Sequence, residues 1–313
     1  VSQTEIARQH AVCAMSVMRF ARSTTTYIHS NYHWLPKNIA FDDFKSGNFA
    51  KSKMSMLLMD SANHRVLDII RSRTNRFLKS YFLQYDLKAR ALVKTVTVDL
   101  YSPYRKLIEE LFPNAIIIAD RFHVVTQAYQ ALNKVRITTM KESGKDSHNS
   151  RALKRYWKLL LKDSDKVDYL HYSKRNNFKN AQLCDQDVVD RLLAMSDKLK
   201  KAYGYYQKLL GAVHQRNASL LKELTASAAG MPEPIKKANR TLKKHRAEII
   251  NNFIFPYSNG PVEGTNNKIK AIKKTSYGFR NFDNFRLRIL LAVKNSFLSL
   301  NYKNQLQKAA HSN

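Results

Sequence analysis

Cysteines, acidic residues and long apolar runs are all scarce in this chain of 313 residues. The only cysteines are Cys13 and Cys184, which excludes a CxxC zinc site and argues against a disulfide framework. No run of about 18 apolar residues occurs, so the sequence predicts no membrane-spanning helix. The N-terminus also lacks the apolar core of a signal peptide. We therefore expect a soluble, cytoplasmic protein.

The shortage of acidic residues leaves a large positive charge. Lys and Arg number 54 against 24 Asp and Glu, for a formal net charge of +30. Such a chain repels itself, and the partner that most often offsets this repulsion is a polyanion. Nucleic acid is therefore the leading partner class.

The N-terminal residues 2–20 have the apolar spacing of two short helices joined by a tight turn. The residues expected to pack inward are Ile6, Val12 and Val17. In a helix-turn-helix reading, Ser16 and Arg19 remain available for phosphates or bases. Ala11 stands where a glycine often occupies the turn, and a simple helical hairpin remains the alternative.

The following segments alternate between strand and helix patterns. Three strands joined by hairpins are expected first, then a helix, a strand, a helix and a buried strand; the expected ranges are 38–44, 54–60, 65–70, 74–84, 94–100, 102–112 and 114–120. This β-β-β-α-β-α-β order is that of the ribonuclease-H-like fold, a mixed α/β sheet. After His123 only helical spacing is evident as far as residue 250, which predicts a large all-helical insertion.

Four regions follow from this pattern. They are an incomplete helix-turn-helix region with a linker, the first part of the catalytic core, the helical insertion, and the C-terminal helices that complete the core, over residues 1–35, 36–140, 141–250 and 251–313. Because the chain opens on Val1 rather than methionine, we expect further residues upstream.

Two aspartates end strands that are neighbours in this topology. Asp42 lies at the end of the first strand and Asp99 at the end of the fourth, so both carboxylates are expected side by side. Two like charges held close are costly unless a cation lies between them. Taken singly, either could simply be a polar residue that terminates a strand.

Glu263 is an isolated acid in the basic stretch "SNGPVEGTNNKIKAIKKTSYGFRN". Pro261 suits a first helical position, so Glu263 falls in the first turn of a helix, where the helix dipole alone would favour it. On a helical wheel it shares a face with Asn267, Lys270 and Lys274. Val262, Ile269 and Ile272 lie on the opposite face.

Together, Asp42, Asp99 and Glu263 supply the hard oxygen ligands that two Mg²⁺ ions require, and Mn²⁺ is expected to substitute. Two such ions about 4 Å apart can promote an in-line displacement at phosphorus. The cations expected to hold DNA phosphates are Lys268, Lys270, Lys273, Lys274 and Arg280, and Asn267 lies among them.

Three long motifs carry a family resemblance: "LPKNIAFDDF", "VTVDLYSPYRKLIEELFPNAIIIADRFHVVTQAYQALNKVR" and "FPYSNGPVEGTNNKIKAIKKTSYGFRNFDNFRLRI". The chain resembles the ISL group of bacterial insertion-sequence transposases, within the DDE transposases, over roughly residues 1–300. The resemblance implies a catalytic triad at Asp42, Asp99 and Glu263, a helical insertion and an N-terminal DNA-binding region. A D-x-x-H pair accompanies the triad in related transposases, which makes Asp120 and His123 auxiliary site residues. The alternative is an Asp–His hydrogen bond that only shapes the strand end.

Further residues are candidate DNA contacts, and the chain differs from that group in two places. Tyr101, Arg121 and Arg280 are candidate phosphate or base contacts. Family members have Glu after the first catalytic Asp, where this chain has Asp43, so Asp42 and Asp43 compete as ligands, and we favour Asp42. The family's cysteine-rich zinc module is absent from these residues.

The function expected from the sequence is that of a DNA transposase. It would bind the terminal inverted repeats of an insertion sequence, cleave with two metal ions and transfer strands, as a homo-oligomer on double-stranded DNA at the bacterial nucleoid. Two alternatives remain. One is a transposase-derived DNA-binding protein without catalysis, and the other is a metal-dependent nuclease on the same fold.

Overall fold

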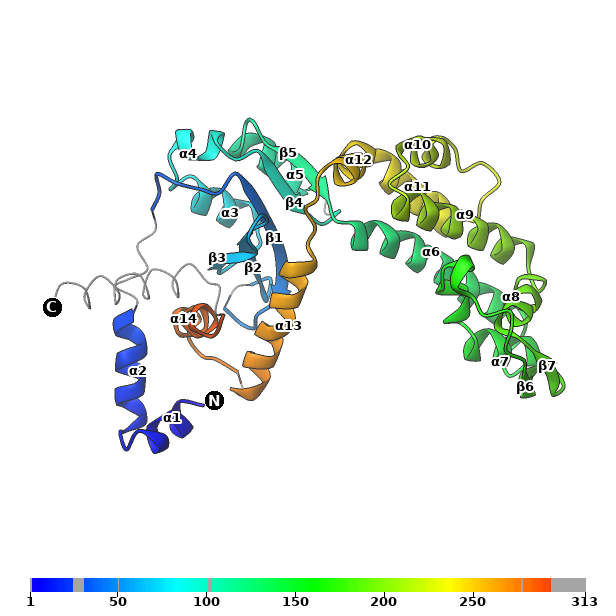
Figure 1. Cartoon of the computed structure of the whole chain (residues 1–313), viewed down its shortest axis with the longest axis horizontal. Coiled ribbons are helices and arrows are strands. Elements are labelled where there is room, and N and C mark those ends of the chain that lie inside the picture. The colour runs from blue at the N-terminus through cyan, green and yellow to red at the C-terminus, as the bar shows by residue number, and fades with distance from the viewer. Residues whose placement is uncertain (1, 25–30, 50, 101–102, 277, 294–313) are drawn as a thin grey trace. The chain divides into compact units, whose positions relative to one another are not determined.

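The chain folds into two compact units. The first comprises residues 1–118 with 256–313, and the second residues 119–255. The structure is a computed structural model (Figure 1), and it describes residues 2–24, 31–49, 51–100, 103–276 and 278–293. Tyr101, a predicted DNA contact, lies outside these residues.

A five-stranded mixed sheet forms the centre of the first unit. Its strands are β1 (Asn38–Lys45), β2 (Met54–Asp60), β3 (Arg65–Ile70), β4 (Thr95–Val98) and β5 (Ile116–Ala119), in the order β3-β2-β1-β4-β5. β1 pairs antiparallel with β2 and parallel with β4. The predicted adjacency of the first and fourth strands is therefore confirmed.

Hydrophobic side chains cover both faces of this sheet. On one face, Phe41 and Val96 pack in a core cluster with α3 (Asn75–Phe82) and α5 (Pro103–Leu111). On the other, Ala40 and Leu57 pack against α13 (Gly260–Thr275) and α14 (Phe282–Ala292). A short α4 (Leu87–Ala91), absent from the predicted order, precedes β4. Strands buried on both faces explain the nearly continuous apolar runs in the sequence.

A polar network attaches α14 to the sheet. Arg286 Nε donates to Asp68 Oδ1 at 2.5 Å, and the Tyr81 hydroxyl donates to Asp68 Oδ2 at 2.8 Å. Burial raises the pKa of Tyr81 well above its ordinary value, and the charge of Asp68 adds to the rise. Burial alone would lower the pKa of Arg286, but the charge and hydrogen bond of Asp68 raise it. The helix that follows α13 is thus fixed to β3 by a partly buried ion pair.

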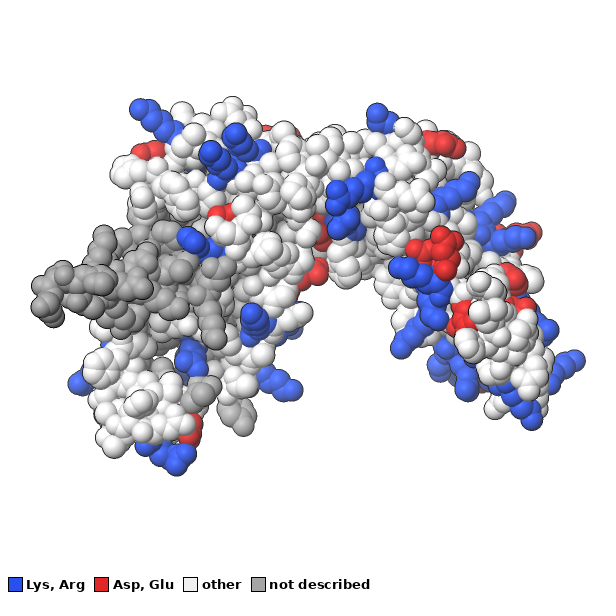
Figure 2. Space-filling view, viewed as in Figure 1, with Lys and Arg blue, Asp and Glu red and all other residues white. Residues whose placement is uncertain are grey.

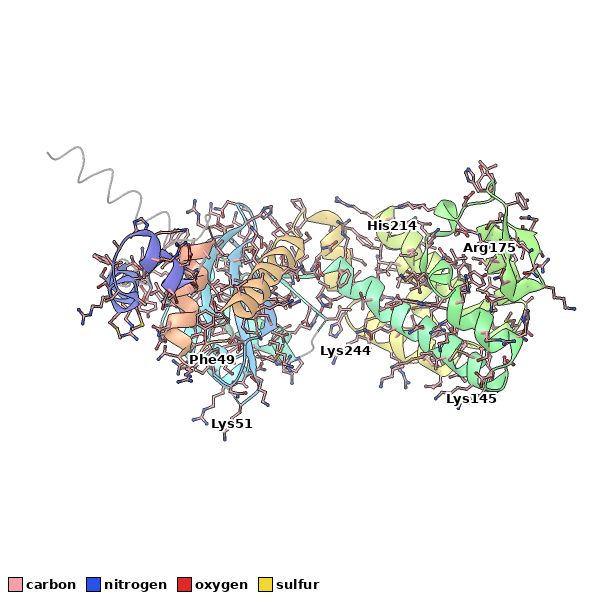
Figure 3. The ribbon with its side chains drawn as sticks, turned by 90° about the horizontal axis from the view of Figure 1, so that it is seen from below. Phe49, Lys51, Lys145, Arg175, His214 and Lys244 are labelled. Atoms are coloured by element: carbon pink, nitrogen blue, oxygen red, sulfur yellow. The ribbon has the colours of Figure 1, made fainter. Side chains whose placement is uncertain are left out.

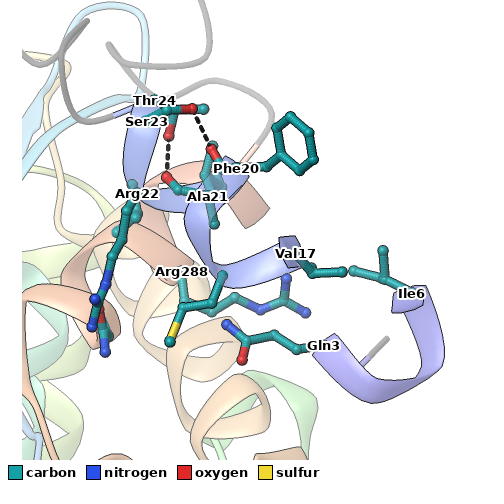
Figure 4. A pocket seen from close by; sticks show the side chains of 13 residues that line it. Gln3, Ile6, Val17, Phe20, Ala21, Arg22, Ser23, Thr24 and Arg288 are labelled. Atoms are coloured by element: carbon teal, nitrogen blue, oxygen red, sulfur yellow. Dashed lines mark hydrogen bonds between the residues drawn. The ribbon is translucent and has the colours of Figure 1, made fainter. Parts of the chain in front are cut away.

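The N-terminal residues form two helices, α1 (Gln3–Gln9) and α2 (Ala14–Ser23), as predicted. Ala11, in the turn between them, has a φ of 50°, a conformation that favours glycine. Ile6 and Val17 line a cavity of about 390 Å³ against α14 (Figure 4). Val12 is 40% exposed, so its predicted inward packing is wrong. A DNA-binding role for this hairpin stays a prediction.

The second unit is mainly helical. The 22-residue helix α6 (Arg121–Glu142) packs against several other helices of this unit, and its buried residues follow helical spacing, as Val124, Ala128 and Val135 illustrate. Its helices are α6 (Arg121–Glu142), α7 (His148–Arg155), α8 (Asp185–Leu193), α9 (Asp197–His214), α10 (Ala218–Ala226), α11 (Glu233–Lys244) and α12 (Arg246–Ile254), with short 3-10 turns at Leu159–Leu161, Ser164–Lys166 and Asn176–Phe178.

The prediction that strands are absent from this region is wrong. Two antiparallel strands, β6 (Ser173–Arg175) and β7 (Ala181–Leu183), form a small sheet. Strands of three residues are too short to show a period-two pattern, so they cannot be recognised from the sequence. Nowhere in the described part of the chain is a helix both long and apolar enough to cross a membrane.

Candidate active site

Two of the predicted catalytic carboxylates lie on adjacent parallel strands. β1 and β4 pair in register as Asn38 with Thr95, Ile39 with Val96 and Ala40 with Thr97. Extending this register by two residues places Asp42 opposite Asp99, which directly follows β4. Since Ala40 faces α13 and side chains alternate along a strand, both aspartates point to that same face. Both are half-buried.

The helix α13 carries the third acid to this face. Asn266 Nδ2 donates to Asp42 Oδ2 at 3.0 Å, and Lys273 Nζ donates to the Lys45 carbonyl at 2.9 Å. The helix therefore runs along β1 in the same direction as the strand. Glu263 precedes Asn266 by three residues, and residues at this spacing are neighbours on a helix surface. Glu263 thus lies one helical turn from the residue that contacts Asp42.

The neighbouring aspartate, Asp43, faces the other side of the sheet. Its Oδ2 accepts hydrogen bonds from Arg73 Nη1 at 2.5 Å and from the Tyr104 hydroxyl at 3.5 Å. Tyr104 belongs to the cluster beneath α3 and α5, on the face away from α13. This geometry favours Asp42 over Asp43 as the partner of Asp99 and Glu263.

Two buried polar atoms on the α13 side find no hydrogen-bond partner among the described residues. These are Thr97 Oγ1 and Asn266 Oδ1. Asn266 is only 5% exposed, and a buried amide oxygen without a donor is rare unless water or a cation lies against it. Carboxylate and amide oxygens are also the ligands that Mg²⁺ and Mn²⁺ prefer. The donor set on this face therefore fits a divalent cation.

The predicted auxiliary pair lies at the start of the second unit. Asp120 follows β5 directly and caps α6, and its Oδ2 lies 3.1 Å from His123 Nδ1. The Asp120 side chain is almost fully buried, whereas His123 is partly exposed. Asp120 and His123 each offer a ligand atom suited to a divalent metal ion. The hydrogen bond exists, and an auxiliary catalytic role for the pair stays a prediction.

The predicted cations of α13 lie mainly on its exposed face. In Figure 2, Lys and Arg side chains lie over the C-terminal half of this helix. Lys270 Nζ contacts Asn267 Oδ1 at 3.3 Å, while Lys273 is half-buried against β1. The exposed predicted contacts on α13 and the loop after it are Asn267, Lys268, Lys270, Lys274 and Arg280.

The other predicted DNA contacts belong to α2 and α6. Ser16 is half-buried in α2, where its hydroxyl lies 3.2 Å from Cys13 Sγ. Arg19 is exposed on the same helix, and Arg121 is partly exposed at the start of α6. Their contacts with DNA remain predictions.

Asn266 is the residue of this site that the sequence analysis missed. The helical wheel divided α13 into an acidic and basic face and an apolar face, and Asn266 belongs to neither. The signal available was its position three residues after Glu263, one turn along the helix.

Fold and site together define a mixed α/β protein in which paired carboxylates lie beneath a helix rich in lysine. The chain belongs to the DDE_Tnp_ISL3 transposase family, whose model matches residues 39–289. The match covers the large sheet from the second residue of β1 onward, the second unit and α13, so it includes all three predicted catalytic acids.

Two curated relatives show similarity of different extent. The transposase for insertion sequence element IS1001 of Bordetella parapertussis is 27% identical over 241 residues, 77% of this chain and 57% of that protein. An "ATP-dependent protease" of Lactococcus lactis subsp. lactis is 41% identical over 125 residues, 39% of this chain and 40% of that protein. The chain thus spans about half the length of these relatives. No solved structure matches it significantly.

Proposed function

We propose that the chain binds the terminal inverted repeats of an insertion sequence and catalyses DNA strand cleavage and strand transfer on a ribonuclease-H-like core. Water attacks a phosphorus at the element end and breaks its P–O3′ bond; the freed 3′-OH then attacks a target phosphorus and displaces another 3′ oxygen. The observation that carries the proposal is the register of Asp42 with Asp99 beneath the helix of Glu263.

The three acids have distinct positions in this proposal. Asp42 and Asp99 approach the reacting phosphate from the sheet, and Glu263 approaches it from the helix. They would hold two Mg²⁺ ions, which when bound activate the attacking oxygen and stabilise the leaving oxygen. Asn266 holds one oxygen of Asp42 at 3.0 Å and so fixes the orientation of that carboxylate. Asp120 and His123 are proposed as auxiliary catalytic residues.

The basic residues bind the phosphate backbone of DNA. Membership of a transposase family implies DNA as the partner. Neutralisation of backbone phosphates by the exposed cations of α13 releases counterions, which makes binding strongly salt-dependent. We further propose that the active species is a homo-oligomer that holds element ends and target DNA together.

A strand-transfer assay tests the proposal. Duplexes with pre-cut element ends are incubated with a target plasmid and Mg²⁺, and joined products are separated on a denaturing gel. The proposed transposase joins the strands, and Glu263→Gln abolishes joining while DNA binding persists. A nuclease would cleave without joining. A DNA-binding protein without chemistry would give neither product, and Glu263→Gln would change nothing.

The name of the Lactococcus relative suggests no second function for this chain. An ATP-dependent protease needs a site for ATP, commonly a G-x-x-x-x-G-K-[ST] loop. The only Gly-Lys pair here is Gly144-Lys145, which Asp146 follows where Ser or Thr is required.

A further inference from the structure

A second concave site lies at the far end of α13 from Glu263. A cavity of about 640 Å³ opens between the β1–β2 hairpin, the last turns of α13 and the loop that leads to α14. The hairpin contributes residues 46–49, the helix contributes Lys270, Lys273 and Lys274, and the loop contributes residues 278–280. Figure 3 marks the hairpin by Phe49 and Lys51.

The walls of this cavity are fixed by contacts within the first unit. The Phe49 ring stacks on Phe285 with centroids 5.4 Å apart, which anchors the hairpin to α14. Lys273 Nζ donates to the Lys45 carbonyl, which anchors the helix to the end of β1. Gly278, at a φ of 96°, donates its N–H to the Lys273 carbonyl at 3.1 Å and fixes the loop. The site is therefore preorganised rather than formed by free surface side chains.

The charge of the cavity selects an anion. Lys270, Lys273, Lys274 and Arg280 line it, and none of the described lining residues is acidic. The C-terminal end of a helix carries only about half a negative charge, so four cations outweigh it. Lys51 and Lys53 are exposed on the same hairpin and extend the positive surface.

The spacing along α13 relates this cavity to the proposed chemistry. Lys270 and Lys274 follow Glu263 by 7 and 11 residues, which correspond to about 10 and 16 Å along a helix. Neighbouring phosphates on one strand of B-DNA are about 7 Å apart in a straight line, because each rise of about 3.4 Å along the axis is combined with a rotation about it. A DNA strand that leaves the carboxylates along α13 would thus present its second or third phosphate to the cavity.

We infer that this cavity binds the backbone of the element-end strand about two to three nucleotides from the scissile phosphate. The length of α13 then sets the distance between the cleaved bond and the phosphate that the cavity binds. The inference rests on the proposed function, because it needs a scissile phosphate at the carboxylates. It goes beyond the exposed cations of α13 in two ways. It assigns the contact to a defined position on the DNA strand, and it makes the β1–β2 hairpin part of the binding site.

Methylphosphonate substitution tests the spacing directly. Element-end duplexes carry a single uncharged methylphosphonate at one of the first eight positions from the cleavage point, and their Kd is measured by fluorescence anisotropy in EDTA. At 0.1 M salt we expect about an eightfold loss of affinity at positions two and three, since one lost contact removes about 0.9 of a counterion. Lys274→Ala and Arg280→Ala should abolish this position dependence, because the contact is already missing.

Controls separate this inference from the proposed catalysis. Lys106→Ala also removes one positive charge, but from an exposed position on α5, which packs on the opposite face of the sheet. This variant should keep the wild-type dependence of affinity on the methylphosphonate position. A duplex of unrelated sequence should show no preferred position. Equal losses at all positions, or an unchanged pattern in both cavity variants, would overturn the inference. Because binding is measured in EDTA, a failure of catalysis in Mg²⁺ leaves this readout intact and refutes only the proposed reaction.

Discussion

Replacement of Asn266 by alanine is the most informative single perturbation of the site. The substitution removes the 3.0 Å hydrogen bond to Asp42 and leaves the bond from the Asp43 N–H to Asp42 Oδ1, at 2.9 Å. Asp42 can then rotate about its side-chain torsions. The substitution also removes the Asn266 amide oxygen, which has no hydrogen-bond partner among the described residues.

The expected effect on activity is larger than the effect on stability. A hydrogen bond to a charged group contributes about 1.5–3 kcal/mol. If this energy serves to orient Asp42 in the transition state, cleavage slows by roughly 10- to 150-fold. The free energy of unfolding should fall by only about 1 kcal/mol, because loss of the buried amide oxygen offsets part of the lost bond.

Single-turnover cleavage across a Mg²⁺ titration, with urea unfolding in parallel, measures both quantities. A positioning role predicts that Asn266→Ala raises the Mg²⁺ concentration needed for half-maximal rate, whereas a purely structural role would not. Asn114→Ala is the matched control, since it deletes a side-chain hydrogen bond of the same 3.0 Å length, to the Ala91 carbonyl, far from α13. Wild-type rate and Mg²⁺ dependence in Asn266→Ala would refute the reasoning.

Further predictions concern the acids, the salt dependence and the core. Asp99→Asn should abolish cleavage with DNA affinity retained within a few-fold in a gel-shift titration; a large loss of binding would assign Asp99 to structure. Asp42→Asn should likewise stop cleavage, whereas Asp43→Asn should keep it and lower the free energy of unfolding by about 1–2 kcal/mol in urea. With five phosphates neutralised, raising salt from about 50 to 200 mM should weaken binding by about 500-fold, and a flat response in anisotropy would contradict the phosphate contacts. Asp68→Asn should destabilise the chain by roughly 3 kcal/mol in urea, because Arg286 is left partly buried and unpaired; a change under 1 kcal/mol would show that this pair is dispensable.

The large sheet was predictable because its strands are buried. Central parallel strands show continuous apolar runs, and hairpins show turn residues between alternating segments. The sequence therefore located all five strands and the adjacency of β1 and β4. It missed α4, β6 and β7, which have five or three residues each and cannot display a period. The compact second unit begins at residue 119, and the predicted insertion at residue 141, so the domain ranges stay predictions.

The sequence only partly predicts which face of the sheet each side chain of the site occupies. Asp42 and Asp43 are adjacent in sequence, and no composition rule separates them. Only pairing partners do so: Arg73 contacts Asp43 from one side of the sheet, and Asn266 contacts Asp42 from the other. These partners lie 30 and 224 residues away, and such long-range hydrogen bonds leave no local pattern in a single sequence.

The contacts that hold α13 explain why an isolated acid, Glu263, occurs on this helix. Asn266 attaches its first half to Asp42 and Lys273 attaches its last turns to Lys45, so the helix cannot slide along β1. Glu263 and the lysines of the cavity are thus kept at a constant separation on one rigid element. In the proposed reaction the carboxylate faces a metal-bearing site and the lysines face phosphates, and a rigid helix keeps these opposite charges from pairing with each other. A flexible loop with the same residues would let Lys270 or Lys274 fold back onto Glu263 and neutralise both functions.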